Sequence, residues 1–309
     1  MSDDPPRRRS IPVTPHSTPA VDAGAATFLH FPLKPDAVAE LVRVALDEDA
    51  AHNDVTTIAT VHASARARAV LVARQPGVIC GVPLALEAVR QMEARGTIRI
   101  DRTDGARVTP GTVILFLSGH ARGLLAAERV ALNFMQRLSG VATLTAKYVD
   151  AVQGTRAKIL DTRKTTPGWR LLEKYAVRCG GGTNHRLDLS DAVLVKDNHL
   201  AAVGGDVQAA VQRARVIAAP GTKVEVECDR MEQVEAAVVA GADIVLVDNM
   251  TLDELREAVR LVDGRATVEA SGGVRLDTVR AIADTGVDWI SVGALTHSAP
   301  ALDLALDFE

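Results

Sequence analysis

The chain has 309 residues, of which 47% are hydrophobic and 24% are charged, and its formal net charge is −4. This length allows one large hydrophobic core, or one large and one small core, and the composition is not that of a disordered protein. The small net charge provides no overall field toward nucleic acids or anionic membranes, so neither is expected as a partner.

The three cysteines, Cys80, Cys179 and Cys228, are too few and too scattered for a disulfide framework or a zinc cluster. They fit a reducing, cytoplasmic location. The chain begins MSDDPPRRRSIPVTPHSTP, with three arginines where a secretory signal needs an apolar segment, so we predict a disordered tail over residues 1–26. No segment reaches the roughly 20 uninterrupted apolar residues of a membrane-spanning helix.

Residues 27–138 predict a small α+β domain with an antiparallel sheet. Its predicted strands are separated by the turns QPG and TPG, and helices are expected at 83–95 and 121–138. The final segment, residues 299–309, is too short to fold alone, and we expect it to pack on this domain.

Residues 139–298 alternate between short β-branched segments, polar or Gly-rich turns and segments of helical period, which indicates βα repeats. The regular spacing favours a parallel α/β barrel over an open doubly wound sheet. The predicted strands are residues 157–163, 192–196, 223–228, 243–249, 266–273 and 288–294. Predicted helices between them include residues 206–219, 230–242, 252–263 and 276–286.

Polar residues or glycines stand at the end of each of these strands. In parallel βα barrels, the reactive groups lie where the strands end and the loops begin. One polar strand end is ordinary solvent exposure, but the whole set predicts one charged site. The positions are Arg163, Lys164, Lys196, Glu227, Asp248, Ser271, Gly272, Gly273 and Gly293.

The cations among these residues suit an anionic substrate. Arg163 can bind a carboxylate or phosphate through two hydrogen bonds, and Lys164 adds a mobile charge. The segment GGGTNHR provides three glycines, which let backbone amides approach a ligand, and then His185 and Arg186 as donors.

Glu227 and Asp248 end consecutive strands. They either tie loops together or bind Mg²⁺ carried in by a phosphate substrate, and the nearby cations favour the second interpretation. A phosphate is expected at the segments ASGG and SVGA on the last two strands. A helix-surface position is expected for three cations at near-helical spacing, Arg170, Lys174 and Arg178.

Several of these segments resemble the quinolinate phosphoribosyltransferase family. The resemblance rests on TRKTTPG, on GGGTNHR followed by KDNH, and on VEVEC, IVLVDN, EASGG and DTGVDWISVGALTHS, and it runs from about residue 33 to the C-terminus. It implies a small N-terminal α/β sandwich domain and an incomplete α/β barrel. The implied reaction joins quinolinate to phosphoribosyl pyrophosphate with Mg²⁺, giving nicotinate mononucleotide, pyrophosphate and CO₂ in NAD biosynthesis.

The resemblance also implies roles for individual residues. Arg163, His185, Arg186 and Lys196 would surround the quinolinate carboxylates. Lys164 would contact the pyrophosphate, and Glu227 and Asp248 the ribose and the metal, so that these three carry the catalysis. Ser271, Gly272, Gly273 and Gly293 would hold the 5′-phosphate. Arg129 would reach into the site of a neighbouring subunit, in a homo-oligomer that is a dimer or a hexamer.

Three other functions compete with this interpretation. A related phosphoribosyltransferase would act on a different substrate, but the complete set of Arg, His-Arg and Lys favours quinolinate. A Schiff-base aldolase would use Lys196 as its nucleophile, although the surrounding anion-binding residues favour a binding cation. A non-catalytic anion-binding protein would not need the pair Glu227 and Asp248.

Overall fold

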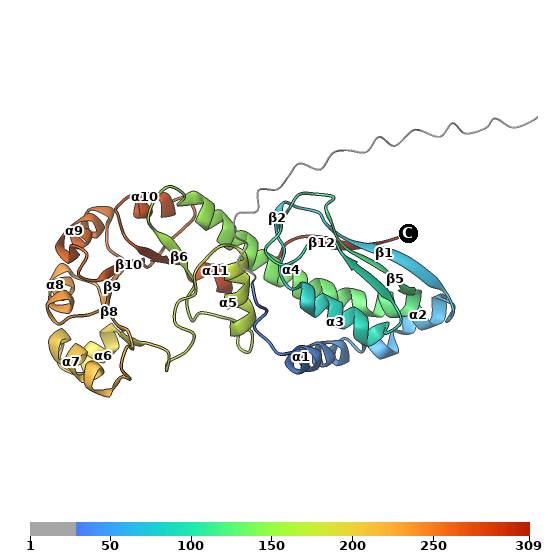
Figure 1. Cartoon of the computed structure of the whole chain (residues 1–309), viewed down its shortest axis with the longest axis horizontal. Coiled ribbons are helices and arrows are strands. Elements are labelled where there is room, and N and C mark those ends of the chain that lie inside the picture. The colour runs from blue at the N-terminus through green and yellow to red at the C-terminus, as the bar shows by residue number, and fades with distance from the viewer. Residues whose placement is uncertain (1–28) are drawn as a thin grey trace, which may run out of the picture.

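The computed structural model describes residues 29–309, so the tail predicted over residues 1–26 lies outside the described residues. Figure 1 shows an antiparallel sheet with its helices at one end of the molecule and a curved parallel sheet with its helices at the other. One long helix, α4 (Ala121–Ala151), runs between them. No helix within residues 29–309 is long and apolar enough to cross a membrane.

The N-terminal part is built on a four-stranded antiparallel sheet of order β12-β1-β5-β3. Its strands are β1 (Arg66–Ala73), β3 (Thr97–Ile100), β5 (Val113–His120) and β12 (Leu304–Phe308). A second, two-stranded sheet consists of β2 (Gly77–Val78) and β4 (Arg107–Val108). The other helices here are α1 (Pro35–Glu48), η1 (Ala51–Asn53), α2 (Val55–Thr60) and α3 (Val82–Met92).

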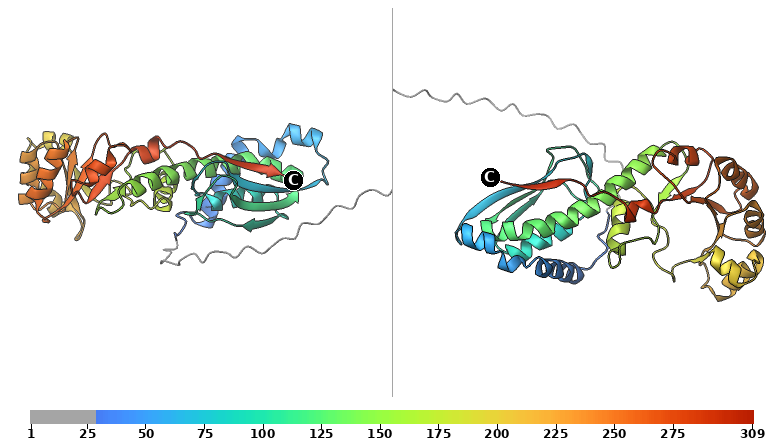
Figure 2. Two further views of the ribbon diagram at one scale, coloured as in Figure 1. Left: turned by 90° about the horizontal axis from the view of Figure 1, so that it is seen from above. Right: turned by 180° about the vertical axis from the view of Figure 1, so that it is seen from behind.

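The C-terminal strand β12 returns from the barrel to this sheet. It pairs antiparallel with β1, with Ala69 opposite Phe308 and Ala73 opposite Leu304. Figure 2 shows the last segment running alongside α4 to reach this position. The N-terminal sheet is therefore completed by the end of the chain, and the barrel is formed by the sequence that lies between its strands β5 and β12.

The barrel is a six-stranded parallel sheet of order β6-β11-β10-β9-β8-β7. Its strands are β6 (Lys158–Leu160), β7 (Val193–Val195), β8 (Val224–Cys228), β9 (Ile244–Asp248), β10 (Thr267–Ser271) and β11 (Trp289–Ser291). Its helices are α5 (Arg170–Cys179), α6 (Asp197–Ala202), α7 (Val207–Ile217), α8 (Met231–Val239), α9 (Leu252–Val262), α10 (Val279–Ala283) and α11 (Ala294–His297). Since β6 and β7 stand at opposite edges, the barrel is incomplete, and the predicted fold class is confirmed.

Helix α4 is longer than the sequence predicted. It continues 13 residues past the expected end at 138, so the proposed boundary between the two domains falls inside it. Ser139 and Thr143 occupy the helix interior because each finds a partner: Ser139 Oγ accepts from the backbone N–H of Cys80 at 2.9 Å, and Thr143 Oγ1 accepts from Val78 at 2.8 Å.

Gly140 also lies inside α4, although glycine often marks the end of a helix. A Cβ at Gly140 would lie 2.1 Å from the carbonyl oxygen of Pro300, in the segment that leads to β12. The glycine is therefore required by a backbone crossing and does not break the helix.

The expectation that the cysteines are scattered is wrong for one pair. Cys80 and Cys179 lie together with Asp104, with their potential ligand atoms within 4.8 Å of one another. The Asp104 carboxylate already accepts hydrogen bonds from the backbone N–H of Val82 at 2.9 Å and from the Tyr175 hydroxyl at 3.0 Å. Burial raises the pKa of the Cys80 thiol, which favours a protonated packing group.

Substituting Gly140→Ala tests the crossing. Helix propensity alone would stabilise the protein by about 1 kcal/mol, but the clash with Pro300 must displace backbone, which costs about 1–3 kcal/mol beyond that gain. We expect the free energy of unfolding, measured by urea denaturation, to fall. Lys147→Ala, at an exposed position of the same helix, is the control and should change little. A stabilised Gly140→Ala variant would contradict the required crossing.

Candidate active site

A cavity of about 430 Å³ lies at the carboxyl ends of the parallel strands. It is lined by Thr162, Arg163, Lys164, His185, Arg186, Leu194, Lys196, Glu227, Leu246, Asp248, Glu269, Ser271 and Ser291. Every predicted cation except Arg129 is in this set, as are both predicted metal ligands. The structure thus brings together side chains that are more than a hundred residues apart in the sequence.

Strand alternation explains this convergence. Successive side chains of a strand point to opposite faces, so residues two apart share a face. On β8, Val224, Val226 and Cys228 are buried toward the helices, while Glu227 lines the cavity. On β9 and β10 the last residues, Asp248 and Ser271, face the same cavity.

Arg163 lies in the loop that follows β6, and hydrogen bonds to neighbouring elements hold this loop in place. Thr296 Oγ1 donates to the carbonyl oxygen of Lys164 at 2.7 Å, and the buried carboxylate of Glu173 accepts from the backbone N–H and hydroxyl of Thr166 at 3.0 and 2.8 Å. The Nε of Arg163 is buried and has no hydrogen-bond partner within residues 29–309. The loop therefore presents the guanidinium to the cavity with hydrogen-bonding capacity to spare.

Asp161, which the sequence analysis did not select, anchors the opposite side of this loop. It is fully buried, and its Oδ1 lies 2.5 Å from Lys174 Nζ and 2.9 Å from the backbone nitrogen of His185. Its Oδ2 accepts from Asn184 Nδ2 at 2.6 Å. Burial raises the pKa of Asp161 and lowers the pKa of Lys174. In the sequence, the feature that indicates this anchoring role is an acidic residue directly after an apolar strand.

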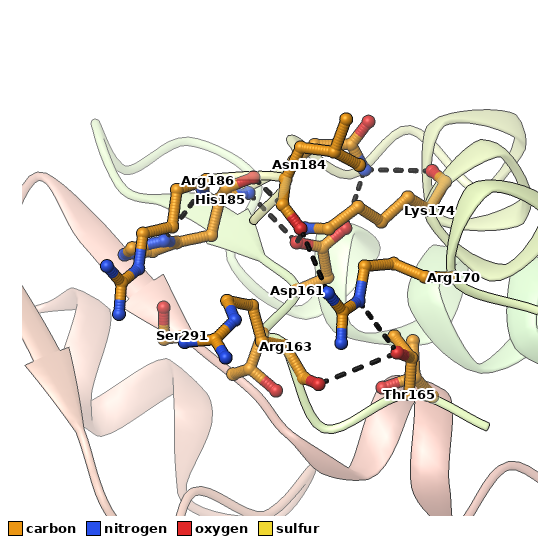
Figure 3. Close-up of polar contacts among 12 residues, drawn as sticks. Asp161, Arg163, Thr165, Arg170, Lys174, Asn184, His185, Arg186 and Ser291 are labelled. Atoms are coloured by element: carbon orange, nitrogen blue, oxygen red, sulfur yellow. Dashed lines mark hydrogen bonds and ion pairs between the residues drawn. The ribbon is translucent and has the colours of Figure 1, made fainter. Parts of the chain in front are cut away.

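The expectation of a helix-surface position is therefore wrong for Lys174, which is 2% exposed. Its ammonium also donates to the carbonyl oxygen of His185 at 3.0 Å. Arg170 and Arg178 are half-buried and donate to Thr165 Oγ1 at 3.1 Å and to Asn184 Oδ1 at 2.6 Å. Figure 3 shows Lys174 and Asn184 next to Asp161 and the loop that carries His185 and Arg186, and Arg170 next to Thr165.

The loop that carries His185 and Arg186 contacts the β6 edge of the barrel. Thr183 forms a parallel bridge to Leu160, the last residue of β6. The three glycines before it were expected to approach a ligand, but a Cβ at Gly180 would lie 2.3 Å from the carbonyl oxygen of Ala142, and one at Gly182 would lie 2.7 Å from Val177. These two glycines serve close packing against α4 and α5.

Arg163 and Arg186 lie near each other in the cavity, beside Ser291 (Figure 3). Burial, followed by the positive charge of Arg163, lowers the pKa of Arg186. The Nη1 of Arg186 donates to the carbonyl oxygen of Ala192 at 3.0 Å. Two adjacent, partly buried guanidinium groups form a strong binding site for an anion.

The other side of the cavity carries the carboxylates of Glu227 and Asp248. Glu227 Oε2 is paired with Lys196 Nζ, and Asp248 Oδ2 accepts from Asn249 Nδ2 at 2.7 Å. Two carboxylates on one face form an oxygen-rich donor set that fits Mg²⁺.

The predicted glycines flank the cavity without lining it. Gly272 has φ +90°, and a Cβ there would lie 2.2 Å from Asn249 Oδ1, so only glycine fits. Gly273 has φ +58° and faces open space. A Cβ at Gly293 would lie 3.2 Å from Lys164 Cδ. Arg129, on α4, has a side chain that is 58% exposed and is outside the cavity lining.

The sequence analysis also missed Glu225, Glu269 and Ser291. His185 Nε2 lies 3.2 Å from Glu225 Oε2 and 3.5 Å from Glu269 Oε2, and Ser291 Oγ donates to Glu269 Oε1 at 2.5 Å. Burial lowers the pKa of His185, but the two carboxylates outweigh it and raise that pKa to about 10. His185 Nδ1, however, accepts from the backbone N–H of Arg186 at 2.8 Å, which places the ring proton on Nε2.

Substituting Lys174→Ala tests the buried ion pair. Removing the ammonium leaves the Asp161 carboxylate buried without its cation, which costs about 3–5 kcal/mol. We expect the free energy of unfolding to fall by that amount in urea denaturation. Lys158→Ala, at an exposed position of β6, should stay within about 0.5 kcal/mol of the wild type. Equal effects of the two substitutions would refute a special role for the pair.

Known proteins resemble the chain over both of its parts. A family model described as quinolinate phosphoribosyl transferase, N-terminal domain, matches residues 54–139, and one described as its C-terminal domain matches residues 141–307. A nicotinate-nucleotide pyrophosphorylase [carboxylating] of Mycobacterium leprae is 47% identical over 280 residues, covering 88% of this chain and 97% of that protein. A probable enzyme of the same name from Bacillus subtilis is 41% identical over 260 residues, covering 84% and 89%.

Solved structures agree with these relatives. The nicotinate-nucleotide pyrophosphorylase from Francisella tularensis superposes with a TM-score of 0.84 at 40% identity, covering 90% of this chain and 99% of that chain. A protein named NadC from Streptococcus pyogenes gives a TM-score of 0.84 at 42% identity, covering 90% and 99%. With both domains matched in order and the cavity residues assembled at one end of the barrel, this chain belongs to the quinolinate phosphoribosyltransferase family.

Proposed function

We propose that the protein transfers a phosphoribosyl group from phosphoribosyl pyrophosphate to quinolinate and releases CO₂, giving nicotinate mononucleotide and pyrophosphate in NAD biosynthesis. Besides membership of the family, one observation supports this reaction. A single cavity holds Arg163, Arg186 and Lys196 beside Glu227 and Asp248. This set supplies cations for a dicarboxylate and oxygen ligands for a metal in the same enclosed space.

Quinolinate carries two adjacent carboxylates on a pyridine ring. Burial, and then the positive charge of the nearby Arg163, lower the pKa of Arg186, so a bound dianion would relieve the repulsion between the two arginines. Lys196 faces the same cavity and is paired with Glu227. The Lys196 ammonium would therefore bind a substrate carboxylate and Glu227 together. His185 lies next to Arg186 in the cavity wall, and both of its ring nitrogens are directed at protein groups.

The transferred ribose is expected on the carboxylate side of the cavity. As pyrophosphate leaves C1, positive charge develops on the ribose, and the carboxylates of Glu227 and Asp248 can stabilise it. Lys164, which is exposed at the rim, would neutralise the leaving pyrophosphate. Glu227 and Asp248 would also hold Mg²⁺, which would contribute charge stabilisation at the pyrophosphate.

Decarboxylation follows from the first bond formed. Once the ring nitrogen is joined to C1 of the ribose it carries a positive charge. The bond from C2 to its carboxylate can then break, leaving its electron pair at C2, which takes up a proton. The role of the protein in this step is to hold the ring, mainly through Arg163 and Arg186.

The 5′-phosphate is assigned to the strand ends of β10 and β11. Ser271 lines the cavity, and the positive φ angles of Gly272 and Gly273 turn the backbone immediately after it. Gly293 lies next to Lys164, so a phosphate at this point would be close to the pyrophosphate position.

A homo-oligomer with shared sites is also proposed. Arg129 is exposed on α4 and does not line the cavity of its own chain, which suits a residue that completes a partner's site. We further propose a cytoplasmic location, because Cys80, Cys179 and Cys228 are all free thiols.

The direct test is to incubate the purified protein with quinolinate, phosphoribosyl pyrophosphate and Mg²⁺ and to measure nicotinate mononucleotide and CO₂. Nicotinate in place of quinolinate is the parallel substrate and should give little product. Product from nicotinate at an equal rate, or none from quinolinate, would rule out the proposed substrate.

Arg163→Ala should lower kcat/KM for quinolinate by about 100-fold or more, because a two-point contact with a carboxylate is lost. Steady-state kinetics with varied quinolinate measures this change. Arg213→Ala, at an exposed position of α7, is the control and should retain wild-type kinetics. A well-folded Arg163→Ala variant with near-normal turnover would contradict the role of Arg163.

Mixing variants tests the shared site. Arg129→Ala and Arg163→Ala chains should each be nearly inactive alone. After mixing and exchange of subunits, a dimer with one variant of each kind has one intact site, so about a quarter of wild-type activity should return. Failure to regain activity, although mixed dimers are detected by mass spectrometry, would show that each site belongs to one chain.

A further inference from the structure

Two buried glutamates of the barrel have no role in the proposed function. Glu225 on β8 is 1% exposed, and Glu269 on β10 is 0% exposed. Each precedes by two residues a side chain that lines the cavity, so both face the interior of the barrel. Burial of a carboxylate is strongly unfavourable unless a cation or hydrogen-bond donors compensate it. The groups that contact Glu225 and Glu269 therefore indicate the role of these two residues.

The donor that the two glutamates share is His185. Its Nε2 lies 3.2 Å from Glu225 Oε2 and 3.5 Å from Glu269 Oε2. Ser291 already donates to the other oxygen of Glu269, at 2.5 Å. Glu269 Oε2 has no hydrogen-bond partner of standard geometry within residues 29–309, and the Nε2–H of His185 is the donor nearest to it.

Every other polar group of His185 is bonded to the loop or to its anchor. Nδ1 accepts from the backbone N–H of Arg186 at 2.8 Å. The backbone nitrogen donates to Asp161 Oδ1 at 2.9 Å, and the carbonyl oxygen accepts from Lys174 Nζ at 3.0 Å. His185 therefore connects strands β8 and β10 to the residue that follows it, Arg186, whose side chain lines the cavity (Figure 3).

We propose, on the basis of the proposed function, that Glu225 and Glu269 are positioning residues that act through His185. By holding its Nε2–H between them, they fix the ring and the loop, and so set where Arg186 stands in the anion site. Their effect on the affinity for quinolinate is exerted through the position of Arg186.

The same three side chains are close enough to hold a metal ion, since their ligand atoms lie within 4.8 Å of one another. A shared proton accounts for the arrangement better. Ser291 already donates to one oxygen of Glu269, and His185 Nε2 lies between the other oxygen and Glu225, so donors already face the oxygens that a metal would need. A bound metal is accordingly an outcome that the experiment must distinguish.

The test uses Glu269→Gln and, separately, Glu225→Gln in the full chain. Each amide keeps the shape of the side chain but removes one of the two charges that hold His185. We expect KM for quinolinate to rise about tenfold or more, the effect of losing a charged hydrogen bond, with kcat and KM for phosphoribosyl pyrophosphate within about threefold of wild type. In ¹⁵N-histidine NMR spectra, the ring nitrogens of His185 should shift in both variants.

Glu93→Gln is the matched control. Glu93 is also buried and pairs with a histidine, His120 Nδ1, at 3.1 Å, but it lies in the N-terminal part away from the cavity. Its KM for quinolinate should not change. If one glutamine variant fails to fold, the other carries the test.

Three results would overturn the proposal while leaving the proposed function intact, because the wild type would still form nicotinate mononucleotide. One is an unchanged KM for quinolinate in both variants. Another is an equal rise in KM for both substrates. The third is a stoichiometric metal, measured by elemental analysis of the wild type, that is lost in Glu269→Gln. A wild type that forms no product would instead refute the proposed function.

Discussion

The two guanidinium groups of Arg163 and Arg186 repel each other across a partly buried cavity, and the structure around them compensates that repulsion. Asp161 begins the loop that carries Arg163, and it binds the loop that carries Arg186 through Lys174 and through the backbone of His185. Glu225 and Glu269 add negative charge on the strand side. All three carboxylates are buried and have partners within the protein, and Glu269 also forms part of the cavity wall, so they offset the positive field of the two arginines.

Helix α4 makes this arrangement rigid. Arg137 on α4 donates to Glu173 Oε1 at 3.1 Å, and Glu173 in turn binds Thr166 in the Arg163 loop. Farther along the same helix lie Ala142 and Thr145. Gly180 and Gly182, in the segment that precedes His185, pack against them. One helix thereby contacts both loops of the anion site. The same helix carries the exposed Arg129 nearer its N-terminal end, so it connects the cavity to the surface that we propose completes a partner's site.

Much of this could be read from the sequence, for a physical reason. Strand ends in a parallel barrel meet at one edge, so the positions of Arg163, Lys196, Glu227 and Asp248 followed from the βα pattern alone. The extent of α4 did not follow, because Ser139 and Gly140 resemble a helix end unless their tertiary partners are known. Lys174 was misplaced for the same reason, since helical spacing does not reveal a buried carboxylate on a distant strand.

Glu225 and Glu269 were missed because a strand-end rule looks only at the last residue, whereas alternation places the residue two positions earlier on the same face. The cavity thus has two tiers of carboxylates. Glu227 and Asp248 are half-buried and line the cavity, where Glu227 pairs with Lys196 and where we propose that both meet the metal and the substrate. Asp161, Glu225 and Glu269 are enclosed and fixed. A substrate with a single carboxylate can pair with only one of the two arginines, while a dicarboxylate can pair with both, so a preference for quinolinate over a monoacid follows from the two adjacent guanidinium groups.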